Sequence, residues 1–377
     1  MTDKIENDDL SFFVLLPPEI QVEILGYLPV PDLFSVSSSS RHLYSLAKNK
    51  SLWTQLTLDW PHIKKNYKFC KDLVQSERYS KLKSALFTCK DRSESFVDTE
   101  YESGKKLANM IDMILDIETL TSIKVDKNIF IAESLLSRIS QKASLTKVDV
   151  SGYRMKSSSL SAFGNLTNLR TLKLFFMHNL NSPKSEDFEH LFSTLKNLTT
   201  VEVPCARITD NAIACLVTNN VKLTHLVIDN CNSVTSKGIR ILAKACPDLQ
   251  HVSMKKCDKF RQADALHLIS SCPQLRHVGF SRISDQTLRK ILEVCPKMQS
   301  MSLHYCQLVS EGGLTELLTS APRFQKLELI KNTILRVPNN FDEKFKIKYP
   351  ESKVQIKIRG ILKYIDGYFP ENREAPW

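Results

Sequence analysis

The hexapeptide LTHLVI at 223–228 decides the fold, because its spacing of apolar residues returns along much of the chain. It is followed by LQHVSM at 249–254 and by LRHVGF at 275–280. Similar hexapeptides, L-x-x-L-x-L or close variants, begin at Leu120, Leu145, Leu169, Leu198, Met298 and Phe324, and a weaker one begins at Glu351. The first nine start 23 to 29 residues apart. A fixed period of this size is typical of a repeat architecture.

Each repeat contains one predicted strand and one predicted helix. Apolar and polar residues alternate at the end of each hexapeptide, as they do in a half-buried strand. Between hexapeptides the period is helical, as in GIRILAKA at 238–245, where Cys246-Pro247 ends the helix. Neither element can bury its apolar side alone, so successive repeats must stack. The sequence therefore predicts an α/β solenoid with parallel strands on the concave face and helices on the convex face.

Composition and charge fit a folded protein with two different surfaces. Hydrophobic residues make up 42% of the 377 residues and charged residues 25%, which is ordinary for globular proteins. The net charge of +11 is uneven, because residues 1–60 hold 4 Lys/Arg against 8 Asp/Glu and the remainder holds 48 against 33. The basic part could attract an acidic protein, a phosphorylated segment or nucleic acid, and charge alone leaves these open.

The chain starts with acidic and polar residues and has no long apolar run, which predicts an intracellular protein, cytoplasmic, nuclear or both, without membrane contact. Its ten cysteines include no CxxC pair. Six of them recur at fixed places in the repeats: Cys231, Cys257 and Cys306 after strands, and Cys246, Cys272 and Cys295 before prolines. A metal site needs converging ligands, whereas a repeat spreads these thiols along its axis. We therefore expect packing thiols, with no metal and no cofactor.

Residues 11–60 do not repeat and read as three short helices. The first begins in LPPEI at 16–20, where proline suits a first turn, and Ile20, Ile24, Leu25 and Leu28 form one apolar face. So short a module carries more large apolar side chains than it can hide. Some of these side chains are therefore expected to contact a partner.

Two motifs resemble known families. The segments CPDL at 246–249 and CPQL at 272–275 resemble the cysteine-containing leucine-rich repeats of F-box proteins, with the best match from Leu223 to Cys306. The series LPPEI, ILGYL at 24–28, Asp32-Leu33, SRHLYSLA at 40–47 and SLW at 51–53 resembles the F-box over its whole length. A run of serines, Ser37–Ser40, replaces the cysteine or valine usual before the Arg41 region.

The resemblance implies a substrate receptor of an SCF-type ubiquitin ligase. In that family the F-box binds the Skp adaptor, which is carried by a cullin scaffold with its RING subunit. The residues that would face the adaptor or form the docking core are Leu16, Pro17, Ile20, Ile24, Leu28 and Leu33, with Leu43 and Trp53 closing the module. The same residues could instead form a self-contained helical core, and for any single one both interpretations stay open.

The concave face of the repeats is the predicted substrate surface, because residues between and after the apolar strand positions must line it. These candidates are Phe175, Phe176, His225, His251, Lys255, Lys256, His277, Arg282, His304, Tyr305 and Lys331. Small residues at 253, 279 and 302 suggest a shallow groove for an acidic or phosphorylated segment. His225, His251 and His277 should form a column that could bind a metal or titrate as a unit near pH 6, or that could be only a solvated row of polar residues. We hypothesise that mutating these histidines affects substrate binding.

We predict the domains as F-box 11–60, linker and cap or degenerate repeat 61–119, leucine-rich repeats 120–349 and C-terminal cap 350–377. No phosphate loop, HExxH, G-x-S-x-G or RING-like ligand set occurs, so the chain is expected to be a non-catalytic adaptor. A non-degradative interaction scaffold is the alternative. Nucleic-acid binding is not favoured, because only Tyr305 and the phenylalanine pair could stack on bases.

Overall fold

A computed structural model describes residues 8–28, 30–37, 39–89, 97–151, 155–176, 183–330 and 340–359. The chain divides into two compact units, Met1–Lys147 and Val148–Trp377, called here the first and second units. None of the described helices is long and apolar enough to cross a membrane.

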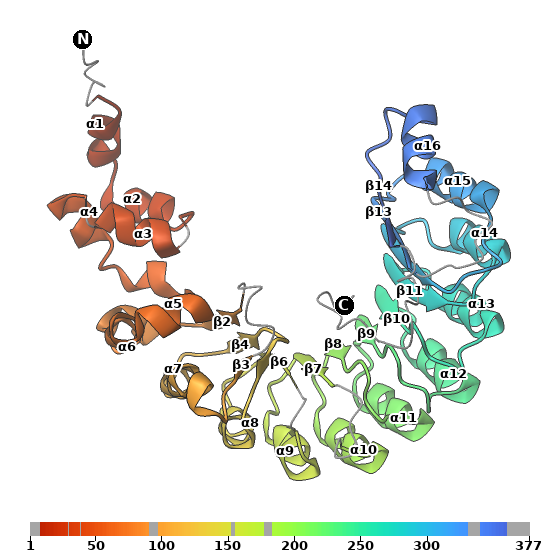
Figure 1. The fold of residues 1–377 in the computed structure, drawn as a ribbon, viewed down its shortest axis with the longest axis horizontal. Coiled ribbons are helices and arrows are strands. Elements are labelled where there is room, and N and C mark those ends of the chain that lie inside the picture. Colours follow the sequence, from red (N-terminus) through yellow and green to blue (C-terminus); the bar gives the residue numbers. More distant parts are fainter. Residues whose placement is uncertain are drawn as a thin grey trace, which may run out of the picture. The chain divides into compact units, whose positions relative to one another are not determined.

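The first unit begins with short helices and then alternates strands with helices (Figure 1). Its α-helices are α1 (Asp8–Leu15), α2 (Pro18–Leu25), α3 (Val30–Ser37), α4 (Arg41–Leu46), α5 (Trp60–Lys65), α6 (Tyr67–Val74), α7 (Lys105–Leu115) and α8 (Glu133–Ser140). Its 3-10 helices are η1 (Lys50–Trp53), η2 (Glu77–Lys81) and η3 (Glu102–Gly104). Its strands are β1 (Gln55–Asp59), β2 (Ser84–Thr88), β3 (Val97–Asp98), β4 (Ser122–Val125) and β5 (Ile129–Phe130). Strand β6 (Lys147–Ser151) starts at the boundary between the units.

The second unit is a regular succession of strands and helices. Its strands are β7 (Thr171–Phe175), β8 (Thr200–Glu202), β9 (His225–Val227), β10 (His251–Ser253), β11 (His277–Ser281), β12 (Ser300–His304), β13 (Lys326–Ile330) and β14 (Gln355–Arg359). Its helices are α9 (Ser157–Ala162), η4 (Phe163–Asn165), α10 (Ser185–Thr194), α11 (Asp210–Asn219), α12 (Ser236–Ala245), α13 (Gln262–Ser271), α14 (Asp285–Val294), α15 (Glu311–Ser320) and α16 (Phe341–Lys348). Within this unit the strands line the inner face and the helices the outer face (Figure 1).

The predicted fold class is confirmed. The twelve strands of the large sheet follow one another in chain order, with β3 and β5 in a small sheet of their own, and the pairs whose register is defined are parallel. Each hexapeptide from Leu120 to Phe324 begins two residues before a strand, as Leu223 does before β9. Strand β2, Ser84–Thr88, lies within the segment 61–119, for which a cap or degenerate repeat was predicted. Strand β1 and helix α1 were not predicted.

The hydrophobic core runs along the repeats between sheet and helices. In the repeat of β9, Leu223, Leu226 and Ile228 are fully buried. Nine of the ten cysteines are buried, and all ten are free thiols. Burial raises the pKa of Cys272 and of Cys295 to about 12 each. These buried thiols pack at the helix ends, as predicted.

Neighbouring helices are joined by a repeated cap. The carboxylate of Asp285, in the first turn of α14, accepts hydrogen bonds from the backbone N–H (2.8 Å) and hydroxyl (2.6 Å) of Ser310. Ser310 is the N-cap of α15, and its hydroxyl accepts a bond from the N–H of Gly313. A side chain at Gly313 would collide with the Asp285 carboxylate, so glycine is needed there for close approach.

We expect Gly313→Ala to lower the free energy of unfolding by about 1–2 kcal/mol, because the new methyl group displaces Asp285 from the cap. Gly312→Ala is the matched control in the same helix, where an added Cβ has room. The control should be neutral or should stabilise by up to about 1 kcal/mol, since alanine is the better helix former. Urea unfolding measures both variants, and equal effects would contradict the cap.

Candidate functional site

Exposed apolar side chains gather on the N-terminal helices of the first unit. Among the described residues, eight of the fourteen exposed large apolar side chains fall between residues 12 and 44: Phe12, Val14, Leu15, Leu16, Ile20, Ile24, Tyr27 and Tyr44. The exposed fraction reaches 79% at Leu15 and 82% at Tyr27. Monomeric proteins seldom gather so much exposed apolar surface without a partner.

The predicted adaptor-facing residues divide by burial. Leu16, Pro17, Ile20 and Ile24 are exposed, and Leu28 and Leu43 are half-buried. Leu33 and Trp53 are buried. The Trp53 indole N–H donates to the Ala47 carbonyl at 2.7 Å, and its ring lies edge-on to Tyr79 at 5.5 Å between centroids. Trp53 therefore supports the module from within.

A buried polar residue that sequence reasoning missed fixes the start of α2. The Gln21 amide donates to the carbonyls of Val14 (3.1 Å) and Leu16 (2.6 Å), and its oxygen pairs with the His42 ring at 2.7 Å. These bonds tie the turn that carries Leu16 and Pro17 to helix α4. A glutamine within an amphipathic helix gives no signal of this role in the sequence.

The predicted histidine column exists on the inner face of the second unit. Parallel register aligns His225, His251 and His277 on adjacent strands. Their ring centroids lie 5.6 Å and 5.4 Å apart along the column. Burial lowers the pKa of each ring, and that of His251, which also has a histidine on either side, falls to about 4. Burial therefore favours the uncharged form of the column near neutral pH.

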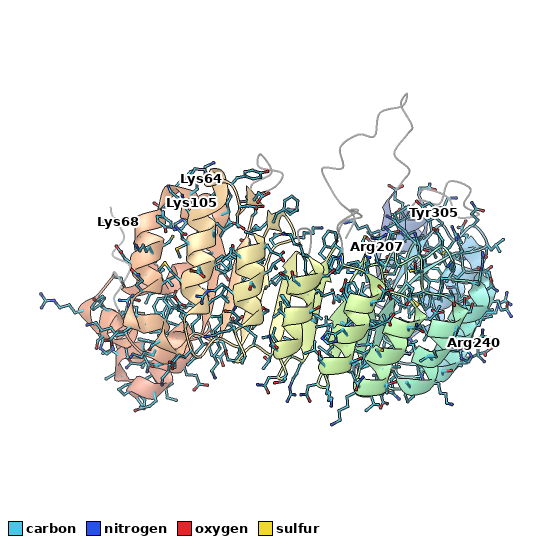
Figure 2. The ribbon with its side chains drawn as sticks, turned by 90° about the horizontal axis from the view of Figure 1, so that it is seen from below. Lys64, Lys68, Lys105, Arg207, Arg240 and Tyr305 are labelled. Atoms are coloured by element: carbon cyan, nitrogen blue, oxygen red, sulfur yellow. The ribbon has the colours of Figure 1, made fainter. Side chains whose placement is uncertain are left out.

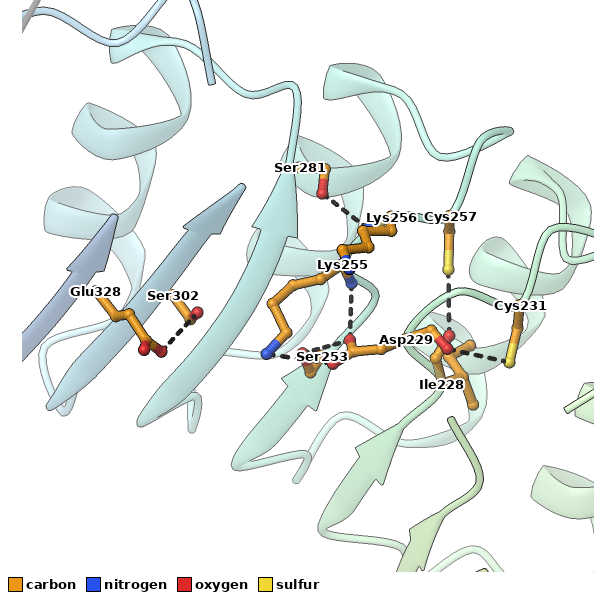
Figure 3. A network of polar contacts seen from close by, with 10 residues as sticks. All are labelled: Ile228, Asp229, Cys231, Ser253, Lys255, Lys256, Cys257, Ser281, Ser302 and Glu328. Atoms are coloured by element: carbon orange, nitrogen blue, oxygen red, sulfur yellow. Dashed lines mark hydrogen bonds and ion pairs between the residues drawn. The ribbon is translucent and has the colours of Figure 1, made fainter. Parts of the chain in front are cut away.

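A buried ion pair lies beside this column (Figure 3). The Asp229 carboxylate accepts hydrogen bonds from the Ser253 hydroxyl (2.6 Å) and the Lys255 N–H (2.8 Å), and it pairs with the Lys255 ammonium at 3.2 Å. A side chain at Gly279 would meet Ser253 and the Lys255 stem. The small residues of the inner face thus make room for Lys255, and its charge is already neutralised.

The other predicted substrate residues differ in position. Phe175, Lys256, Arg282 and Tyr305 are half-buried or exposed. Phe176 is buried because it continues the inward series of Leu172 and Leu174, whereas His304 is buried at the end of β12, where the alternation breaks. Phe176 packs edge-on against Phe188 at 5.5 Å. Lys331 lies outside the described residues.

We expect acid to destabilise the fold through His251. The unfolded chain takes up this proton near pH 6.5, whereas the folded chain does so near pH 4. The free energy of unfolding should therefore fall by about 2 kcal/mol from about pH 7.5 to about pH 5 on account of this ring. His251→Gln should flatten that dependence, whereas His267→Gln, at an exposed helical position, should leave it unchanged. Denaturant titrations at both pH values measure the difference.

Removing either partner of the Asp229–Lys255 ion pair should lower stability by a different amount. Asp229→Ala should lower stability by about 3 kcal/mol, because the Lys255 ammonium, whose side chain is only 17% exposed, loses its partner. Lys255→Met should cost about 1 kcal/mol, since Asp229 keeps the Ser253 hydroxyl and the backbone N–H. Equal losses of stability for the two variants in thermal unfolding would contradict this asymmetry.

Among the described residues no group of three or more His, Cys, Asp or Glu side chains could hold a metal ion.

Residues 13–59 match the F-box-like family. No curated protein matches the chain. The crystal structure of the Rad7 and Elc1 complex in yeast aligns with a TM-score of 0.46 at 10% identity, covering 89% of this chain and 95% of that one. So distant a likeness adds nothing to what the repeats themselves show. The chain thus carries a segment similar to the F-box-like family at residues 13–59, followed by strand–helix repeats that form a solenoid.

Proposed function

We propose that the chain is the substrate-recognition subunit of an SCF-type ubiquitin ligase. The F-box-like helices would bind the Skp adaptor, and the repeats would hold a protein substrate for ubiquitination and proteasomal degradation. The observation that carries the proposal is the apolar surface around Leu16, Ile20 and Ile24, which is exposed in the isolated chain and lies within the family match.

The geometry of α2 supports adaptor docking. Ile20 and Ile24 are four residues apart and so share one side of the helix. Gln21 and Leu25, at the next positions, face inward and are buried. The helix is thus anchored by one side while the other presents aliphatic side chains. Burial of such side chains supplies most of the free energy in helix-mediated contacts.

The role of the chain in this proposal is proximity. Ubiquitin transfer would be performed by the enzymes that the cullin scaffold recruits, and the receptor would raise the effective concentration of substrate lysines near them. The inner face of the repeats suits a binding role, because it is polar and largely preorganised. Lys173 pairs with Glu202 at 2.7 Å, and the Ser302 hydroxyl bonds to Glu328 at 3.2 Å.

We expect the double variant Leu16→Asp/Ile20→Asp to bind purified Skp adaptor at least about 100-fold more weakly, because two carboxylates would have to be desolvated in an apolar contact. The matched control is Ile347→Asp, an 81% exposed aliphatic residue on α16 of the second unit. Calorimetric titration measures affinity, and thermal unfolding verifies that each variant folds. Undiminished binding by the double variant would overturn the docking face.

A capture experiment separates a degradative receptor from an interaction scaffold. Proteins bound by the intact chain and by the double variant are compared with the proteasome inhibited. We expect captured proteins to be ubiquitinated with the intact chain alone. Captured proteins that carry no ubiquitin in either sample would support the scaffold alternative.

A further inference from the structure

A small pocket lies at the edge of the inner face of the second unit, where strands β11 and β12 end. It has a volume of about 370 Å³ and is lined by Arg282, Ile283, Tyr305, Gln307 and Leu308. These residues come from two adjacent loops, the one after β11 and the one after β12. Figure 2 shows Tyr305 on the same edge of the unit as Arg207, away from Arg240 on helix α12.

Half of the exposed large apolar side chains described in the second unit lie at this pocket. Among its described residues, the second unit exposes four large apolar side chains: Val221, Tyr305, Leu308 and Ile347. Two of the four border this one pocket, and Leu308 is 59% exposed. Ile283 forms a buried apolar floor. An apolar hollow with a few polar groups at its rim is the usual form of a binding pocket.

The backbone of both loops is held in a conformation that side chains disfavour. Arg282 has φ 58° and Tyr305 φ 52°, in the left-handed region where glycine is unstrained. Each N–H donates to the neighbouring repeat, from Arg282 to the His304 carbonyl at 3.2 Å and from Tyr305 to the Ile330 carbonyl at 3.4 Å. The same left-handed conformation recurs at Cys205, Asn230 and Lys256, so it belongs to the turn that follows successive strands, and it fixes where the Arg282 and Tyr305 side chains leave the backbone.

The loops on this edge of the second unit are basic, which favours an anionic ligand. The segments leading from strands β8–β12 to the following helices carry six cations, Arg207, Lys255, Lys256, Lys259, Arg261 and Arg282, against two anions, Asp229 and Asp258. Arg282 donates a hydrogen bond from Nη1 to the Asp258 carbonyl at 3.0 Å and meets the Asp258 carboxylate at 3.5 Å, with side chains 49% and 64% exposed. An exposed pair of this kind contributes little, so another anion can replace Asp258 on the guanidinium.

We propose that this pocket anchors a short peptide segment in which a large apolar residue is followed closely by an anionic one. The apolar side chain enters between Tyr305 and Leu308, and the carboxylate or phosphate of its neighbour binds Arg282. The inference rests on the proposed function in that the repeats bind a protein. A peptide fits better than nucleic acid, because the lining offers an aliphatic floor and a single aromatic ring instead of successive stacking surfaces.

The test is selection from a random peptide display library on the full-length protein. We expect enriched peptides to carry Leu, Ile, Met or Phe beside Asp or Glu. Their affinity should fall about tenfold or more with Leu308→Glu and stay unchanged with Val221→Glu, a matched variant at a 64% exposed apolar site outside the pocket. Resynthesised peptides with Glu replaced by phosphoserine distinguish the two anions.

Two further variants exclude a merely structural effect. Tyr305→Gly removes the side chain where glycine adopts φ 52° freely, so thermal stability should hold or rise while peptide affinity falls. Arg282→Glu should shift the selected residue beside the apolar anchor from acidic to basic. No enrichment, enrichment indifferent to these variants, or a single-stranded RNA oligonucleotide binding in a way that depends on Leu308 would each overturn the proposal.

The failures of this proposal and of the proposed function are distinguishable. If Leu308→Glu captures the same proteins as the intact chain, the pocket proposal fails while adaptor docking stands. If the Leu16/Ile20 variant retains the adaptor but the selected peptides still depend on Leu308 and Arg282, the docking face fails and the pocket stands.

Discussion

The structure depends on contact between neighbouring repeats. A single strand and helix cannot cover the residues Leu223, Leu226 and Ile228, yet each is fully buried once the next repeat is stacked on it. Polar groups also find their partners in the neighbouring repeat. Asp285 caps the helix that follows its own, and Asp229 accepts hydrogen bonds from the next repeat. The free energy of folding therefore resides largely between repeats. An inner face assembled in this way is preorganised before any partner arrives.

Strand positions could be predicted because the hexapeptide admits only one register. A shift by one residue would turn the apolar positions outward, so the alignment of His225, His251 and His277 followed from the spacing alone. Strand β1 was missed because QLTLD at 55–59 lies in a stretch that resembles the F-box. Helix α1 was missed because DDLSFFVL at 8–15 precedes the LPPEI signal and lacks a clear apolar period.

The candidate site was predictable only in part, because tertiary partners are invisible in the sequence. Lys255 reads as a free cation for substrate, but Asp229, 26 residues earlier, neutralises it in the fold. Phe176 and His304 read as surface residues, and both are buried where their strands end. Titration of the histidine column as a unit near pH 6 was one possibility, but burial lowers the pKa of each ring and moves that of His251 to about 4. Each difference arises from burial or from a contact between repeats.

The row of thiols at the helix ends can report local unfolding of the solenoid. Cys246, Cys272 and Cys295 occupy the same place in successive repeats, and burial keeps their pKa values near 11 to 12. An alkylating reagent attacks the thiolate and needs access to it, so each sulfur is shielded for as long as its own repeat stays closed. Local opening of one repeat would thus leave a chemical mark at a known residue, and the order of marking along the chain would record where the solenoid begins to unravel.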